Sequence, residues 1–172
     1  MQSRSNGFSL LEVLITILLI TVGVLGMVAM QGRAIQYTND SMHRTQAAIL
    51  ANELIEILRA TPTKATTDAT FYISEEDGGL PSSAGNCRYI DDADLVDKQL
   101  ACWGNKVRRL LPDAGAADVV GQFYACRSVV AGSCGDGAAI EVQLAWRAAG
   151  GQCLNDADAD SDICFYRVRT QI

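Results

Sequence analysis

The chain has 172 residues, of which 49% are hydrophobic and 20% are charged. Its 14 Lys and Arg residues against 20 Asp and Glu residues leave a formal net charge of −6 at pH 7, so general electrostatic attraction to nucleic acid or to anionic lipid is not expected. The length suits one domain of about 100–150 residues plus an additional segment. We therefore expect a single hydrophobic core.

An apolar run dominates the N-terminal part of the chain. It extends from Phe8 to Met30 and carries one charged residue, Glu12. A helix of about 20 residues crosses a bilayer core of about 30 Å, so the run is long enough for one membrane span. An ionised side chain inside the hydrocarbon costs about 2.5–3.5 kcal/mol on insertion scales, which predicts that Glu12 has a cationic partner.

The residues before this run, Met1 to Gly7, are short and polar and contain one basic side chain, Arg4. Such a segment favours a cytoplasmic N-terminus and an exported C-terminal part. A secretory signal peptide fits less well. Its apolar region is usually about 7–15 residues long, and no small-residue cleavage box closes this run.

Beyond the apolar run, the helical pattern continues without a turn cluster as far as Thr61-Pro62. Apolar residues such as Ala47, Leu50 and Leu54 recur at helical spacing. The sequence thus predicts one long helix in two parts. Residues 8–30 are apolar all round, whereas residues 31–60 carry one apolar stripe that packs on a globular head formed by residues 61–172.

A second helix is expected in the head over residues 92–111. Asp91 or Asp92 is a suitable N-cap and Pro112 ends the helix, while a connector before it, from residue 61 to 74, is expected to end in a short strand at 71–73. We interpret Trp103 as a core anchor rather than a ligand-binding aromatic. The apolar stripe of this helix is predicted to consist of Leu95, Trp103, Val107, Leu110 and Leu111.

Three runs are predicted to form strands, at 119–130, 139–147 and 163–171. The middle run alternates, which indicates one buried and one exposed face. Together the strands predict an antiparallel sheet whose apolar face packs on residues 31–60, giving an α+β fold. The residues expected to face inward are Ile140, Val142, Leu144 and Trp146, and those expected to face outward are Glu141, Gln143, Ala145 and Arg147.

The N-terminal pattern of Gly7, Phe8 and Glu12, followed by an apolar helix, resembles the class III signal of type IV prepilins. The resemblance implies that a prepilin peptidase in the membrane cuts after Gly7 and methylates the new amine of Phe8, so that residues 1–7 are a cleaved leader. It also implies that Glu12 neutralises an N-terminal amine during assembly.

A second part of the chain resembles the PilV type of minor pilin, the type IV pilus modification protein. The matching residues are Asp94-Leu95, Trp103, Leu111-Pro112, Val142 and Trp146. This resemblance implies a non-enzymatic subunit that primes or joins a type IV pilus and supports motility and adhesion. It implies a single-pass inner-membrane protein with a periplasmic head, later exposed on the pilus. The implied partners are other major and minor pilins, the prepilin peptidase and the inner-membrane assembly machinery.

Two other functions are compatible with the sequence. A pseudopilin of a type II secretion system has the same leader. A signal-anchored periplasmic enzyme or ligand-binding domain is the less favoured alternative, because the sequence shows no phosphate-binding glycine loop, paired His-carboxylate motif or nucleophile elbow. No catalytic residue is therefore predicted.

All six cysteines follow the apolar run, in the part of the chain that the resemblance and the topology place in the oxidising periplasm. Strand order narrows the fifteen possible pairings. A zinc site is disfavoured because the chain has no CxxC pair and His43 is its only histidine. The expected disulfides are Cys153–Cys164 across the last strand connection and Cys126–Cys134 around a glycine-containing turn. Cys87 and Cys102 are the two cysteines that remain, and they form the third expected pair.

Aspartates occupy alternate positions between the last two cysteines. The loop departs from an EF-hand because Ser161 stands where glycine is required and Arg167 where the bidentate glutamate belongs. We expect a solvated acidic loop and no cofactor, with calcium as the alternative. The aspartates that would bind it are Asp156, Asp158, Asp160 and Asp162.

Overall fold

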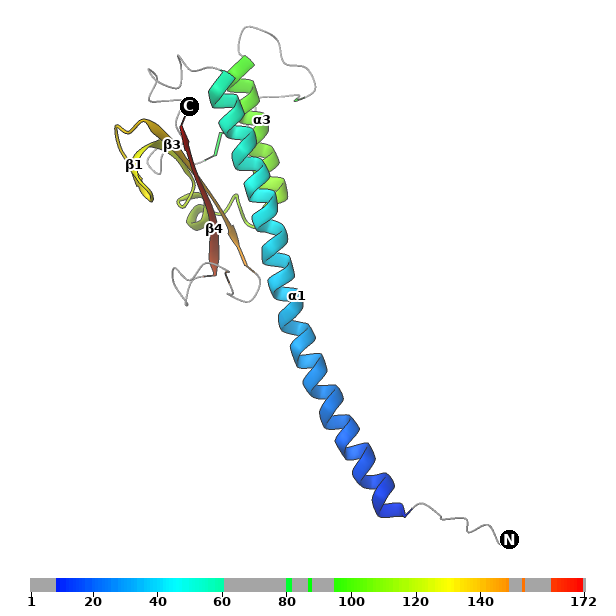
Figure 1. Cartoon of the computed structure of the whole chain (residues 1–172). Coiled ribbons are helices and arrows are strands. Elements are labelled where there is room, and N and C mark those ends of the chain that lie inside the picture. Colours follow the sequence, from blue (N-terminus) through cyan, green and yellow to red (C-terminus); the bar gives the residue numbers. More distant parts are fainter. Residues whose placement is uncertain are drawn as a thin grey trace, which may run out of the picture.

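The computed structural model describes residues 9–60, 80–81, 87, 95–148, 153 and 162–171. A long N-terminal helix packs at its C-terminal end on a small antiparallel sheet (Figure 1), which confirms the predicted α+β fold. In chain order the elements are α1 (Leu10–Ala60), α3 (Leu95–Leu110), α4 (Ala117–Val120), β1 (Tyr124–Val130), β2 (Ser133–Cys134), β3 (Ala139–Arg147) and β4 (Ile163–Gln171).

Helix α1 contains 51 residues and is about 77 Å long at 1.5 Å per residue. Ser9 caps its start: the Leu11 N–H donates to Ser9 Oγ at 3.3 Å and the Glu12 N–H donates to the Ser9 carbonyl at 3.0 Å. The helix ends at Ala60, as predicted, and Phe8 lies outside the described residues. Its N-terminal part extends away from the head (Figure 1).

The sheet has the order β2-β1-β3-β4, and every neighbouring pair is antiparallel. Strands β3 and β4 occupy the predicted ranges. The first predicted strand, 119–130, is wrong in its first part, because Ala117–Val120 forms the short helix α4. Burial of Val119 and Phe123 in the core, both 0% exposed, favours this helical turn over the strand preference of the two valines.

Helix α3 falls inside the predicted range of 92–111, while the expected cap at Asp91 or Asp92 and the strand at 71–73 lie outside the described residues. Leu95 does not belong to the buried stripe, since its side chain is 39% exposed. Val96 takes that position, because it precedes Leu100 by four residues on the same helix face. The buried residues of α3 are Val96, Leu100, Ala101, Trp103, Gly104 and Val107.

The core lies between α1, α3 and the sheet, and two tryptophans join these elements. The indole N–H of Trp103 donates to the Leu50 carbonyl of α1 at 2.9 Å, which confirms Trp103 as a core anchor. The indole N–H of Trp146 donates to Asp40 Oδ1 at 3.0 Å. The buried face of α1 consists of Asp40, Ala47, Leu50, Ala51, Leu54, Ile55 and Leu58.

Strand β3 is buried on both faces, so the expectation of an exposed face was wrong. Glu141 is 0% exposed and Gln143 is 5% exposed. The reason is the central position of β3, which lets side chains of both neighbouring strands cover its polar face. Gln143 Oε1, for example, accepts two hydrogen bonds from the Arg167 guanidinium, at 3.0 and 2.7 Å.

The buried Glu141 carboxylate is fully engaged. It accepts hydrogen bonds from Tyr124 Oη at 2.7 Å, the Gly132 N–H at 2.7 Å and Ser128 Oγ at 3.1 Å, and Arg167 Nε lies 3.3 Å away. Gly132 has φ 83°, a conformation that favours glycine. Burial by itself would raise the pKa of Glu141, but these donors and the Arg167 charge hold that pKa below its usual value.

Three disulfides staple the head, and they are the three expected pairs. Their Cα–Cα distances are 5.7, 5.6 and 5.2 Å, within the usual range for a disulfide. No described cysteine is free. The pairs are Cys87–Cys102, Cys126–Cys134 and Cys153–Cys164.

Helix α3 holds the segment at residues 80–81 by close contact. A Cβ atom at Gly104 would lie 2.3 Å from the Pro81 carbonyl oxygen. Arg108 donates to the same oxygen at 3.0 Å and also donates to the Leu80 carbonyl. Because the obstacle is backbone, the position requires glycine.

We therefore predict that Gly104→Ala destabilises the head by about 1–3 kcal/mol through overpacking. Helix propensity alone predicts the opposite, a gain of about 1 kcal/mol. Thermal unfolding of the detergent-solubilised chain, followed by near-UV circular dichroism of the buried tryptophans, measures the effect. The matched control is Gly32→Ala in α1, where a Cβ atom meets nothing within 4 Å. A Gly104 variant as stable as this control would contradict the prediction.

Glu141→Gln is expected to cost about 1–3 kcal/mol at pH 7, because a charged acceptor of several buried donors is lost. The pKa of Glu141 is lower in the folded state, so its contribution to stability is present above the usual Glu range and is lost as the pH falls through the folded-state pKa. Urea unfolding at a series of pH values should show the gap between wild type and variant closing in acid. Glu56→Gln, which removes an exposed charge, should show little gap at any pH.

Candidate functional site

The N-terminal half of α1 presents a large apolar surface. Every residue from Ser9 to Asn39 is exposed, and the exposure of the large apolar side chains runs from 43% at Val13 to 91% at Leu10. A surface of this extent marks a membrane or protein contact. By length and composition α1 is able to cross a membrane, which is consistent with membrane anchoring.

The threonine hydroxyls within the apolar run are satisfied inside the helix. The Thr16 hydroxyl donates to the Val13 carbonyl and the Thr21 hydroxyl donates to the Leu18 carbonyl, both at 2.8 Å. Side-chain hydroxyls bonded in this way leave no free donor on the helix surface. The segment is therefore compatible with an apolar environment on all sides.

Glu12 is the one charged residue between Ser9 and Met30, and the structure places it in the first turn of α1. A negative charge there complements the positive end of the helix dipole. No Lys or Arg of the described residues forms an ion pair with it. The two predicted processing residues, Gly7 and Phe8, lie outside the described residues.

Asp40 marks the boundary between the exposed and the packed parts of α1. It is 3% exposed and is the first buried residue of the helix. Sequence analysis did not identify it. A signal was present, since Asp40, Ala47 and Leu54 are seven residues apart and so share one helix face.

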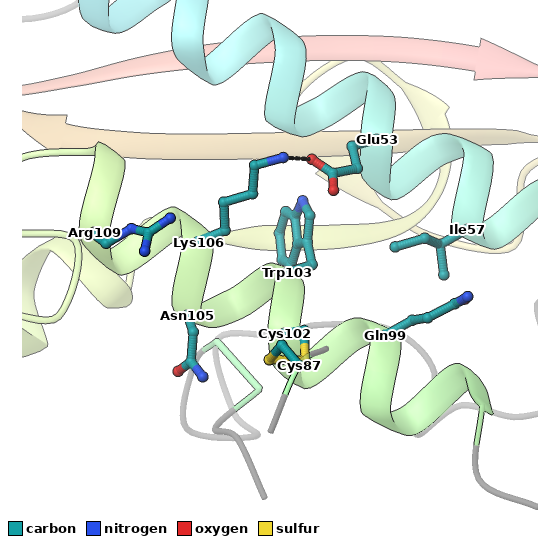
Figure 2. Close-up of a pocket in the computed structure, with 9 residues that line it drawn as sticks. All are labelled: Glu53, Ile57, Cys87, Gln99, Cys102, Trp103, Asn105, Lys106 and Arg109. Carbon is teal, nitrogen blue, oxygen red and sulfur yellow. Dashed lines mark hydrogen bonds and ion pairs between the residues drawn. A yellow bond between two sulfur atoms is a disulfide. The ribbon is translucent and has the colours of Figure 1, made fainter. Parts of the chain in front are cut away.

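The head carries an open cavity of about 590 Å³ between α1 and α3. Figure 2 shows Lys106 of α3 reaching across to Glu53 of α1, and their charged atoms are 2.6 Å apart. Trp103 is 2% exposed and forms only the floor. The lining residues are Glu53, Ile57, Cys87, Gln99, Cys102, Trp103, Asn105, Lys106 and Arg109. None of these is a histidine, serine or threonine, and Cys87 and Cys102 are joined in a disulfide, so this lining holds no Ser–His or Cys–His pair.

The acidic loop has one candidate ligand in the described residues, Asp162, and its carboxylate is bonded to Arg147. Arg147 also pairs with Asp118 and, at 3.2 Å, with Asp113. The hydrogen bond with Asp118 is the main cause that raises the pKa of Arg147, and it lowers the pKa of the Asp118 carboxyl. Calcium binding stays a prediction here. The other three candidates, Asp156, Asp158 and Asp160, lie outside the described residues.

Comparison with known proteins identifies the N-terminal segment. The family model described as "Prokaryotic N-terminal methylation motif" matches residues 2–28, which include Gly7, Phe8 and Glu12. No curated protein and no solved structure gave a match. The motif supports a type IV pilin-like protein and implies processing by a prepilin peptidase and assembly with other pilins.

We predict that the mature chain begins at Phe8 and is heavier by one methyl group at its amine, which mass spectrometry of the membrane-extracted protein measures. Gly7→Val should block cleavage and lead to accumulation of precursor, because an extended backbone at a peptidase centre leaves little room for a side chain. Gly23→Val, within the helix, is the control and should be processed normally. A mature terminus at Met1, or one near Met30, would refute the prediction.

Proposed function

We propose that this chain is a minor type IV pilin, a non-enzymatic subunit that primes or joins the pilus through α1. The observation that carries the proposal is the division of α1 at Asp40. Residues up to Asn39 are exposed, mostly apolar and preceded by the methylation motif, whereas the residues from Asp40 onward anchor the head. One half of the helix is thus available to lipid or to other helices.

The same surface serves the stored and the assembled subunit. In the bilayer, lipid tails cover the apolar side chains from Leu10 to Met30. In a fibre, the helices of other major and minor pilins cover them. Because lipid is as apolar as a neighbouring helix, packing and polar contacts decide the association, and the hydrophobic effect does not. The inner-membrane assembly machinery supplies the energy for extraction.

Glu12 sets the axial position of the subunit in this proposal. Its carboxylate lies four residues, about one helical turn, beyond the amine that cleavage creates at Phe8. An ion pair in a bundle of low dielectric constant stabilises only the arrangement in which charges meet. We assign the partner amine to an adjacent subunit, while the amine of the same chain is the geometric alternative.

The head faces the periplasm in this scheme, and later the pilus surface. The three disulfides support an oxidising compartment. The PilV type is the subtype we favour, because the sequence around Trp103, Val142 and Trp146 resembles that type. Roles in twitching motility and adhesion would follow from membership of the pilus.

A pseudopilin of a type II secretion system is the second candidate, because the methylation motif is common to both classes. A signal-anchored periplasmic enzyme or ligand-binding domain is less favoured, since the lining of the cavity between α1 and α3 holds no Ser–His or Cys–His pair. The leader does not distinguish a pilin from a pseudopilin. The effect of a gene deletion on pili and on protein secretion distinguishes them.

We predict that deleting the gene reduces surface pili and twitching motility and leaves protein secretion unchanged, and that the wild-type gene restores both. Glu12→Ala should be cleaved and inserted normally, yet be at least about tenfold depleted from sheared fibres, since one ion pair of roughly 1.4 kcal/mol corresponds to that factor. Glu12→Asp should be partly defective because its carboxylate is one methylene shorter.

Glu56→Ala, an exposed acid at the other end of α1, is the charge control and should incorporate normally. Loss of secretion with intact pili would assign the chain to the secretion system instead. Full incorporation of Glu12→Ala would show that apolar packing alone sets the axial position.

A further inference from the structure

The three disulfides differ in the solvent exposure of their cysteines. Cys164 is 0% exposed and its partner Cys153 is half-buried, while Cys126 is 8% exposed and its partner Cys134 is exposed, so each of these bonds has one end inside the head. Cys87 is exposed and Cys102 is half-buried, and both line the cavity between α1 and α3 (Figure 2). Cys87–Cys102 is therefore the disulfide of the described residues in which neither cysteine is buried, and it lies in an open cavity.

The charges around this bond are uneven. Lys106 follows Cys102 by four residues, which places the two side chains next to each other on one face of α3. Arg109 lies one further turn along and lines the same cavity. Glu53 offsets part of the Lys106 charge through their ion pair at 2.6 Å. Arg109 forms no ion pair with any described carboxylate.

Nearby cations stabilise a thiolate relative to a thiol, and a more stable thiolate is a better leaving group in exchange. Lys106 and Arg109 are the cations of α3 that line the same cavity as Cys102. The Cys87 sulfur, on the more exposed residue, is the better target for attack. Access and electrostatics thus point to the same direction of bond cleavage.

We propose that Cys87–Cys102 is a thiol–disulfide exchange site that reacts with dithiols. A thiolate of the dithiol attacks Cys87 Sγ, the bond between the two cysteines breaks, and Cys102 leaves as a thiolate that later takes a proton. The second thiol of the dithiol then attacks the mixed disulfide and releases Cys87. The dithiol is oxidised to a disulfide, and the chain gains two electrons and two protons as two thiols.

Opening this bond leaves other links between α3 and the rest of the head in place. Trp103 still bonds to the Leu50 carbonyl, and Arg108 still donates to the carbonyls of Leu80 and Pro81. The reaction therefore breaks only the covalent link between Cys87 and α3. It depends on the head alone and is independent of the proposed pilus function.

The test uses the full chain in detergent with limiting dithiothreitol, alkylation at set times and peptide mass spectrometry. Cys87 and Cys102 should be labelled together, and at least about tenfold faster than the other four cysteines, as thiol access controls the rate. With glutathione and acid quenching, the mixed disulfide should form on Cys87 while Cys102 carries the free thiol.

Arg109→Gln should slow the opening several-fold, whereas Arg33→Gln, which removes a charge from the exposed part of α1, should leave the rate unchanged. Faster or simultaneous opening of either other disulfide would overturn the exchange site. Glutathione on Cys102, or an unchanged rate for Arg109→Gln, would overturn the assignment of Cys102 as the leaving group. Processing and fibre incorporation are not read out here, so either result stands apart from the pilus assays.

Discussion

The buried hydrogen bond between the Trp146 indole and the Asp40 carboxylate lies at the point where α1 changes its environment. On one side of it the helix is exposed, and on the other side its apolar stripe packs against β3, β4 and α3. A carboxylate in a core is tolerated only when it is bonded, so the tryptophan of the central strand makes this position of Asp40 possible. The placement of the head on α1 depends on this contact and on the hydrogen bond from the Trp103 indole of α3 to the Leu50 carbonyl of α1.

Much of the fold could be predicted from local sequence patterns. The end of α1 at Ala60 follows from helical spacing and the Thr61-Pro62 break, and the bounds of β3 follow from its alternation. The errors occurred where distant residues decide the outcome. Glu141 was expected at the surface, yet it is buried because Tyr124 and Arg167 come from both neighbouring strands, and no local pattern contains that information.

The candidate site divides in the same way. The methylation motif that includes Gly7, Phe8 and Glu12 could be recognised because it is a short linear segment, and a linear segment is fully visible in a sequence. Asp40 was missed because its partner, Trp146, is 106 positions away. The amine proposed as the partner of Glu12 belongs to a second chain or to the terminus that cleavage would create, so it lies outside the fold of one precursor chain.

The exposed part of α1 before Asp40, called the stem below, also acts as a lever arm. Leu10 lies about 45 Å along the helix from Asp40 at 1.5 Å per residue. A change of about 10° in the angle between stem and head would therefore displace the tip of the helix by about 8 Å, more than one helical turn of 5.4 Å. Errors in seating the head are magnified several-fold at the membrane end. The two indole hydrogen bonds and the packed apolar stripe of α1 thus fix the direction of the helix, although they lie far from its N-terminal end.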